Sequence, residues 1–172
     1  SKEAIEYARS MLEYLIETKV ATTVFTEESD NFSDISNKYK LPFVSKKENE
    51  ILINGNGGVE NLEFNVRLKV FERENCCDVD LVIIIGGDGT VLWGNHLFTG
   101  HKKPPFLTFN LGTLGYLTYF KCSDYKKVID ELLLNQNRLI EYEKRSTLDI
   151  SFISEDEKLK NLKLNCLNEV IF

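Results

Sequence analysis

The stretch of the sequence best suited to chemistry is GGDGTVL, which follows the apolar run LVIII. Gly86, Gly87 and Gly89 lie between a predicted buried strand and a predicted helix, and Thr90 closes the segment. Glycines allow a close approach of the backbone to a ligand, and amide N–H groups at a helix start can converge on phosphate oxygens. The segment therefore predicts a phosphate-binding loop, although it matches neither Walker A nor G-x-G-x-x-G.

Asp88 lies inside this loop and gives it a second role. A carboxylate is poorly suited to binding phosphate alone. It can accept a proton from an attacking hydroxyl group, or hold Mg²⁺ against phosphates. We interpret Asp88 as a candidate catalytic base. The alternative is a tight turn between strand and helix in which Asp88 only caps the helix.

A second glycine-containing segment, NLGTLGYLTYF, follows the next predicted strand and begins at Asn110. Gly112 and Gly115 are spaced along it, and Tyr116 comes directly after them. Ligands of open parallel sheets bind at the carboxyl ends of strands, so two such loops after successive strands are expected to face one crevice. Tyr116 is then a candidate for stacking on a base. The alternative is a bend with a core tyrosine.

The third candidate segment is LNEVIF at residues 167–172. Asn168 offers a donor and an acceptor, and Glu169 offers two acceptors, a combination that suits sugar hydroxyl groups. The alternative is a solvated strand end.

These candidates need an α/β framework, which the first three quarters of the sequence predict. Apolar residues recur at helical spacing over 4–16, and the apolar run at 80–85 is typical of a strand buried on both faces of a parallel sheet. The predicted elements are helix 4–16, strand 20–25, strand 50–54, turn 54–58, helix 61–75, strand 80–85, helix 90–98, strand 104–110 and helix 123–135 with Ser123 as N-cap. We therefore expect a Rossmann-like parallel sheet with flanking helices.

The pattern changes after Asn137, where polar and apolar residues begin to alternate. Residues 139–153 and 159–172 predict a β-hairpin with one solvated face, joined by a turn at EDEK. We expect an α/β nucleotide-binding domain over 1–137 and the first strands of an antiparallel all-β domain over 138–172. A lone hairpin is marginally stable in water, which indicates a partial chain.

The net charge of −6 and the pI near 5.1 argue against nucleic acid or an anionic membrane as the main partner. No apolar run approaches the roughly 20 residues of a membrane span. His96 and His101 are isolated from other metal ligands and are expected at the surface or at a helix end. The cysteines form no metal-binding pattern and predict reduced thiols in a cytosolic type of compartment: Cys76, Cys77, Cys122 and Cys166.

The three motifs together, in this order and spacing, resemble the NAD kinase family. The leading EAIEYARSMLEYLIETKVATTVF and the later EYEKRSTLDI share that resemblance, which covers most of the chain except the region around 30–75. The GGDGT loop alone is also similar to diacylglycerol and sphingosine kinases, and a relative of it occurs in phosphofructokinases. The second and third motifs favour NAD kinase, and the P-x-G-T-G-N-D-type motif of the lipid kinases is absent.

The resemblance implies transfer of the ATP γ-phosphoryl group to the 2′-hydroxyl of the adenosine ribose of NAD, giving NADP. The resemblance implies that Asp88, which matches the family's aspartate, contacts that hydroxyl and activates it. Tyr116 matches the position near the adenine where the family has an aromatic residue, more often Phe. The matched nucleotide-binding residues are Gly86, Gly87, Gly89, Thr90, Asn110, Gly112, Gly115, Tyr116, Asn168 and Glu169.

The resemblance further implies Mg²⁺ with ATP, and no clear protein ligand for the metal is visible. It also implies a cytoplasmic protein, in which a homo-oligomer could form through the C-terminal domain. The family normally has a strand before the first helix and a T-P-T-G-S-T-A-type segment after Asn-Glu, and neither is present. We therefore expect a piece of a kinase that is inactive alone. A nucleotide-binding module without catalysis and a lipid kinase remain the alternatives.

Overall fold

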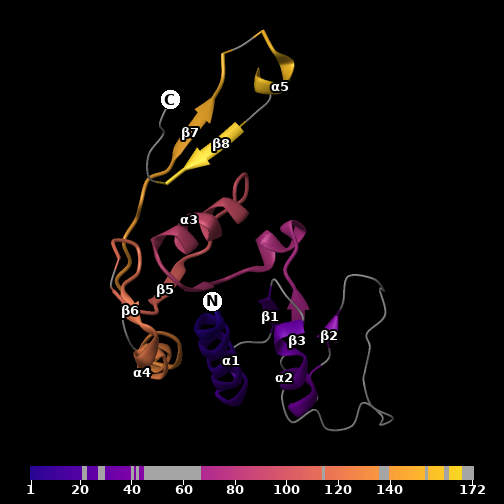
Figure 1. Cartoon of the computed structure of the whole chain (residues 1–172), viewed down its shortest axis with the longest axis vertical. Coiled ribbons are helices and arrows are strands. Elements are labelled where there is room, and N and C mark those ends of the chain that lie inside the picture. Colours follow the sequence, from indigo (N-terminus) through magenta and orange to yellow (C-terminus); the bar gives the residue numbers. More distant parts are fainter. Residues whose placement is uncertain are drawn as a thin grey trace. The chain divides into compact units, whose positions relative to one another are not determined.

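The structure is a computed structural model of the chain (Figure 1). It divides into two compact units, one formed by Ser1–Asn75 with Lys121–Arg138 and one by Cys76–Phe120 with Leu139–Phe172. The residues that it describes are 1–20, 23–26, 30–39, 41, 43–44, 67–113, 115–135, 140–153, 155–160 and 163–167.

The first unit begins with α1 (Lys2–Glu17), which confirms the helix predicted over 4–16. Ser1 is its N-cap, and its hydroxyl oxygen accepts a hydrogen bond from the Ala4 amide at 3.2 Å. The C-terminal half of the apolar face is the buried half, with Met11, Leu12, Leu15 and Ile16. The helix therefore packs on the core mainly through its last two turns.

The sheet of this unit is parallel and has the order β1-β3-β2. Its strands are β1 (Thr23–Thr26), β3 (Arg67–Val70) and β2 (Phe43–Val44), and α2 (Ser33–Lys38) lies between β1 and β2 in the chain. The buried core cluster joins the helices to the central strand through Leu12, Ile16, Ile35, Leu41 and Leu68. The strand predicted at 20–25 is confirmed as β1.

The helix predicted over 61–75 is wrong, because Arg67–Val70 forms the central strand β3. Its prediction relied on Leu62, Val66 and Val70, which are spaced as on a helix. Leu68 also places an apolar residue at every second position of the same stretch, which is the pattern of a strand. Parallel pairing with β1 and β2 decides in favour of the strand. The strand predicted at 50–54 and the turn at 54–58 lie outside the described residues.

The helix predicted over 123–135 is broken into three turns: η3 (Cys122–Asp124), α4 (Tyr125–Ile129) and the π-helical η4 (Asp130–Leu134). Ser123 is not its N-cap, because the helical turns already begin at Cys122 and the hydroxyl bonds to the Asp124 carboxylate instead. The segment packs on α1. The Tyr14 hydroxyl donates to Asp130 at 2.5 Å, and the Tyr14 and Tyr125 rings meet edge to face.

The second unit contains the strand and helix that flank GGDGT, β4 (Val82–Ile85) and α3 (Asp88–Leu97), followed by β5 (Phe106–Asn110). These elements confirm the predictions for 80–85, 90–98 and 104–110. β4 and β5 pair in parallel with Ile85 opposite Phe109, so both strands end at the same edge. The third strand in this sheet is β6 (Phe120–Lys121).

The strand β4 is less buried than its apolar sequence predicts. Among its four residues Ile84 is buried, and the others are partly exposed. Ile84 packs against α3 at Gly94, where a β-carbon would lie 2.8 Å from the Ile84 Cδ1 atom. The absence of a side chain at Gly94 thus allows the helix to lie directly on the strand.

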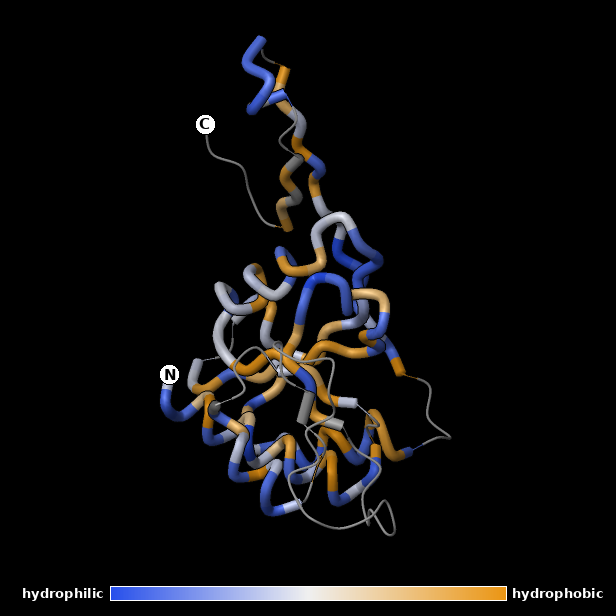
Figure 2. The backbone as a smooth tube through the Cα atoms, turned by 90° about the vertical axis from the view of Figure 1, so that its right-hand side faces the viewer, coloured by the Kyte–Doolittle hydropathy of each residue, from blue (hydrophilic) through white to orange (hydrophobic). Residues whose placement is uncertain are grey.

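An antiparallel hairpin of β7 (Leu148–Ser151) and β8 (Lys163–Cys166) follows, as predicted. Figure 2 shows hydrophobic and hydrophilic residues mixed along it. None of the hairpin's described residues is buried, and Leu148 is 56% exposed, so a single solvated face stays a prediction. The EDEK stretch leads into a short helix, α5 (Glu157–Lys160), rather than a simple turn. The assignment of 138–172 to a β domain stays a prediction. No helix in the described ranges has the length and apolar character needed to cross a membrane.

The packing of α1 gives a first prediction. Ile16 is 0% exposed and Ile5 on the same helix is 37% exposed. Ile16→Ala is expected to lower the free energy of unfolding by about 2–5 kcal/mol, because it leaves a cavity in the core. Ile5→Ala, the matched control, is expected to lower it by less than about 1 kcal/mol. Urea titrations of both variants measure the difference, and equal losses would contradict the assigned core.

The four cysteines are free thiols, and their exposure predicts different reactivities. Cys122 is 2% exposed, and burial raises its pKa to about 11, whereas Cys77 is exposed. Only the thiolate reacts with iodoacetamide, so at pH 8 Cys122 is expected to be alkylated at least about 100-fold more slowly than Cys77. Peptide mass spectrometry over time measures both rates. Comparable labelling of the two residues would show that Cys122 is accessible.

Candidate active site

The GGDGT segment connects β4, which ends at Ile85, to α3, which begins at Asp88. Gly87 is the N-cap of α3, and its carbonyl oxygen accepts hydrogen bonds from Thr90 N at 2.9 Å and Val91 N at 3.3 Å. Asp88 is therefore the first residue of the helix, and Gly89 and Thr90 follow in its first turn. The helix dipole favours an anion at this end.

Gly86 has no room for a side chain. A β-carbon there would lie 2.3 Å from the Thr90 hydroxyl oxygen. The Gly86 amide donates to the Phe109 carbonyl at 2.8 Å, which ties the loop to β5. Gly87 and Gly89 are exposed and have open space where a β-carbon would be. The backbone of the loop is thus fixed at Gly86 and uncovered at the helix start.

The carboxylate of Asp88 binds the second glycine loop. Oδ2 accepts a hydrogen bond from Tyr116 N and Oδ1 accepts one from Leu117 N, both at 2.9 Å. A β-carbon at Gly115 would lie 2.1 Å from Asp88 Oδ1, so the carboxylate occupies the space of a missing side chain. The two glycine loops are thus in contact through Asp88, and the crevice that they are predicted to face stays a prediction. The alternative was that Asp88 only caps its own helix. In the described residues the N-cap is Gly87, and the Asp88 carboxylate bonds to the second loop instead.

Two buried threonines hold the second loop in shape. The Thr108 hydroxyl donates to the Leu117 carbonyl at 2.8 Å and accepts from Tyr119 N at 3.2 Å. The Thr118 hydroxyl oxygen accepts from Gly115 N at 3.0 Å. Because both hydroxyl groups are buried, these bonds are shielded from competing water. The loop therefore presents its amides to Asp88 in a fixed geometry.

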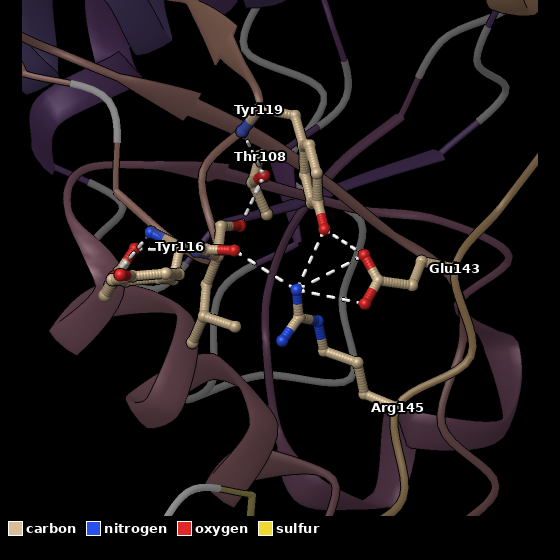
Figure 3. A network of polar contacts seen from close by, with 7 residues as sticks. Thr108, Tyr116, Tyr119, Glu143 and Arg145 are labelled. Atoms are coloured by element: carbon tan, nitrogen blue, oxygen red, sulfur yellow. Dashed lines mark hydrogen bonds and ion pairs between the residues drawn. The ribbon is translucent and has the colours of Figure 1, made fainter.

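A cation that the sequence analysis did not identify lies on the other side of this loop. Arg145 Nη2 donates to the Tyr116 carbonyl at 3.2 Å and the Tyr119 hydroxyl at 2.9 Å, and it pairs with Glu143 at 3.1 Å (Figure 3). The Tyr119 hydroxyl also donates to Glu143. The hydrogen bond to Tyr119, and then the Glu143 carboxylate, raise the pKa of Arg145, so the guanidinium stays charged.

The remaining predicted site residues have different surroundings. Tyr116 is 89% exposed, so the alternative of a core tyrosine is wrong, and stacking on a base stays a prediction. Gly112 is exposed in a bend after β5. Asn110, the last residue of β5, is 3% exposed, and its side-chain oxygen and nitrogen have no hydrogen-bond partner in the described part of the chain. Asn168 and Glu169 lie outside the described residues.

The signal for Arg145 in the sequence was weak. EYEKRSTLDI carried the family resemblance, but nothing in its spacing distinguished Arg145 from Lys144. Only the fold brings the segment to Tyr116. His96 and His101 are exposed, as predicted. Within the described ranges, no three His, Cys, Asp or Glu side chains gather closely enough to hold a metal ion.

Comparisons with known proteins show which family the chain belongs to. The family model described as ATP-NAD kinase N-terminal domain matches residues 1–137. The chain belongs to the NAD kinase family. The match favours this family over the lipid kinases that share the GGDGT loop. It also covers the two glycine loops and both strands that carry them.

Individual members of the NAD kinase family show the same relationship. An NAD kinase of Lachnoclostridium phytofermentans is 34% identical over 125 residues, covering 66% of this chain and 42% of that protein. The mitochondrial NADH kinase POS5 of Saccharomyces cerevisiae is 41% identical over 61 residues, covering 36% of this chain and 15% of that protein. The chain thus spans less than half the length of these relatives.

A solved structure shares the fold. The crystal structure of yeast NADH kinase complexed with NADH matches 95% of this chain and 42% of that chain, with a TM-score of 0.59 and 24% sequence identity. The NAD kinase fold, with parallel sheets and flanking helices, is therefore the fold of this chain.

The contact between Asp88 and Gly115 gives a prediction about the site. Gly115→Ala is expected to displace the carboxylate and free the amides of Tyr116 and Leu117, because a β-carbon would overlap Asp88 Oδ1. Their hydrogen exchange, followed by NMR, is expected to become at least about tenfold faster.

Gly112→Ala is the matched control, because a β-carbon at Gly112 meets nothing within 4 Å. It is expected to leave exchange at Tyr116 and Leu117 unchanged. Equal effects of the two substitutions would contradict the packing of Asp88 against Gly115.

Proposed function

We propose that this protein is an NAD kinase, which transfers the γ-phosphoryl group of ATP to the 2′-hydroxyl of the adenosine ribose of NAD and forms NADP. The observation that supports this most is the place of Asp88. Its carboxylate lies at the first residue of α3, beside a loop suited to phosphate, and is held by two amides of the second loop. A base fixed beside a phosphate loop is what transfer to a hydroxyl group requires.

In the proposed reaction Asp88 accepts the proton of the 2′-hydroxyl. The ribose oxygen forms a bond to the γ-phosphorus, the bond from that phosphorus to the bridging oxygen breaks, and ADP leaves with this oxygen. Such transfer depends on positioning and charge neutralisation more than on covalent chemistry with the protein. The two fixed amides hold the carboxylate in one orientation for the incoming hydroxyl.

The phosphates of ATP are proposed to bind at the start of α3. The amides of Gly87 and Gly89 are in an exposed stretch there, and the Thr90 side chain is exposed beside them. A chain with a net charge of −6 repels a nucleotide at long range, so local amides and the helix dipole must offset this. Mg²⁺ is proposed to enter as part of the substrate, MgATP, since it keeps water and phosphate ligands.

The dinucleotide is proposed to bind along the second loop. The exposed Tyr116 ring is available for stacking on adenine, and Gly112 leaves the adjoining backbone open. Asn110 ends β5 beside this loop, and Asn168 and Glu169 are proposed as partners of sugar hydroxyl groups. The family includes proteins named NAD kinase and NADH kinase, so both dinucleotides are candidate acceptors.

One observation favours a second candidate, a nucleotide-binding module without catalysis. Both oxygens of Asp88 already accept hydrogen bonds from the protein, as in a purely structural carboxylate. Each carboxylate oxygen has a second lone pair, however, so Asp88 keeps capacity for a substrate hydroxyl. We therefore prefer the kinase to the non-catalytic module. As the sequence resemblance implies, we further propose that the protein is cytoplasmic and associates with itself through a C-terminal domain.

The proposal predicts a selective effect of Asp88→Asn. The amide keeps the size of the carboxylate but is not a base, so kcat for NADP formation from NAD and MgATP is expected to fall at least about 10²-fold. KM for NAD is expected to change by a smaller factor than kcat. It is not expected to be unaffected, because the asparagine NH2 group is a donor and the side chain can accept from only one of the two amides of the second loop. Coupled NADP assays and calorimetry with NAD, on the full-length protein with and without the substitution, measure the two effects.

Asp80→Asn is the control, because Asp80 is an exposed carboxylate two residues before β4. It is expected to leave kcat unchanged. Undiminished turnover in Asp88→Asn would remove Asp88 from the chemistry. Binding of NAD without any turnover by the full-length protein would support the non-catalytic module.

A further inference from the structure

The peptide group between Tyr116 and Leu117 is bound at both of its ends by charged side chains. Its carbonyl oxygen, on Tyr116, accepts from Arg145 Nη2 at 3.2 Å. Its N–H, on Leu117, donates to Asp88 Oδ1 at 2.9 Å. A peptide group is planar, with its C=O and N–H pointing in opposite directions, so fixing the carbonyl also fixes the direction of the N–H.

The charges at the two ends have the signs that strengthen both bonds. A cation on the carbonyl polarises the peptide and makes its N–H a better donor, and an anion on the N–H makes the carbonyl a better acceptor. Arg145 and Asp88 are thus linked through one peptide group without touching each other. Nothing in the sequence spacing connects these two residues.

Arg145 is itself held in place. All of its hydrogen bonds to described residues come from one nitrogen, Nη2, which meets Tyr116, Tyr119 and Glu143 (Figure 3). The Tyr119 amide in turn bonds to Thr108 on β5. Lys144, the neighbouring cation, is exposed and lies over the Tyr142 ring, outside this network. The arrangement is specific to Arg145.

We propose that Arg145 is a positioning residue, which orients the Asp88 carboxylate by fixing the Tyr116–Leu117 peptide. That Arg145 fixes this peptide does not depend on which reaction the protein catalyses. That it thereby assists phosphoryl transfer rests on the proposed function. Arg145 itself does not touch the reacting atoms in this role. It keeps the amides of the second loop directed at Asp88, so that the carboxylate meets the acceptor hydroxyl in one orientation.

The first test measures the loop directly. Arg145→Met removes the donor and keeps a long side chain, and it is expected to speed hydrogen exchange at Leu117 at least about tenfold. Arg145→Lys is expected to stay within about threefold of the unaltered protein, because one ammonium nitrogen can replace Nη2. Lys144→Met, the same change at the next residue, is expected to have no effect.

Two results of this experiment would overturn the proposal. One is unchanged exchange at Leu117 in Arg145→Met. The other is an equal acceleration of the β5 amides, Phe106–Asn110, which would show a general loosening of the unit. Acceleration confined to Tyr116 and Leu117, with rescue by lysine, supports it.

The second test measures turnover. Arg145→Met is expected to lower kcat for NADP formation at least about tenfold with KM for NAD within about threefold, and Arg145→Lys is expected to recover most of kcat. An unchanged kcat with a freed Leu117 amide would overturn the positioning role and leave the kinase proposal intact. If the full-length protein makes no NADP, the kinase proposal fails, and exchange at Leu117 alone decides whether Arg145 fixes the loop.

Discussion

The interaction on which the rest of the site depends is the pair of hydrogen bonds from Tyr116 N and Leu117 N to the Asp88 carboxylate. They join the loop after β4 to the loop after β5, although 28 residues separate Asp88 from Tyr116. A buried or half-buried carboxylate needs such donors, because leaving it unpaired costs several kilocalories per mole. The bonds also leave lone pairs on both oxygens, so one carboxylate can serve structure and chemistry together.

The fold around the site brings these two loops together. β4 and β5 are parallel and end at one edge, which places the loops side by side. Gly115 has no side chain because the Asp88 carboxylate occupies that space, and Gly86 has none because Thr90 does. The net charge of the chain is −6, so groups that favour an anion near the loops must be local, and the dipole at the start of α3 is one of them. Asn110, buried without a described partner beside the loops, is consistent with a site whose ligand completes its hydrogen bonds.

The sequence predicted the parts of the site that are local in the chain. An apolar run, a glycine-rich turn and a helical pattern follow one another around Asp88, so their order could be inferred without tertiary information. β3 was missed because the apolar residues of 61–75 fit both a helical and an alternating period, and pairing with β1 and β2 decides between them. Arg145 was missed because its partners, Tyr116 and Tyr119, lie 29 and 26 residues away. Only the folded chain brings them into contact.

A crystal structure of the protein with NAD bound would test the proposed role of Asp88 through one distance. We expect an Asp88 carboxylate oxygen within about 2.6–3.2 Å of the 2′-oxygen of the adenosine ribose, with the amides of Tyr116 and Leu117 still on the carboxylate. A complex in which the dinucleotide is bound, the 2′-hydroxyl lies elsewhere and Asp88 contacts only the second loop would contradict it.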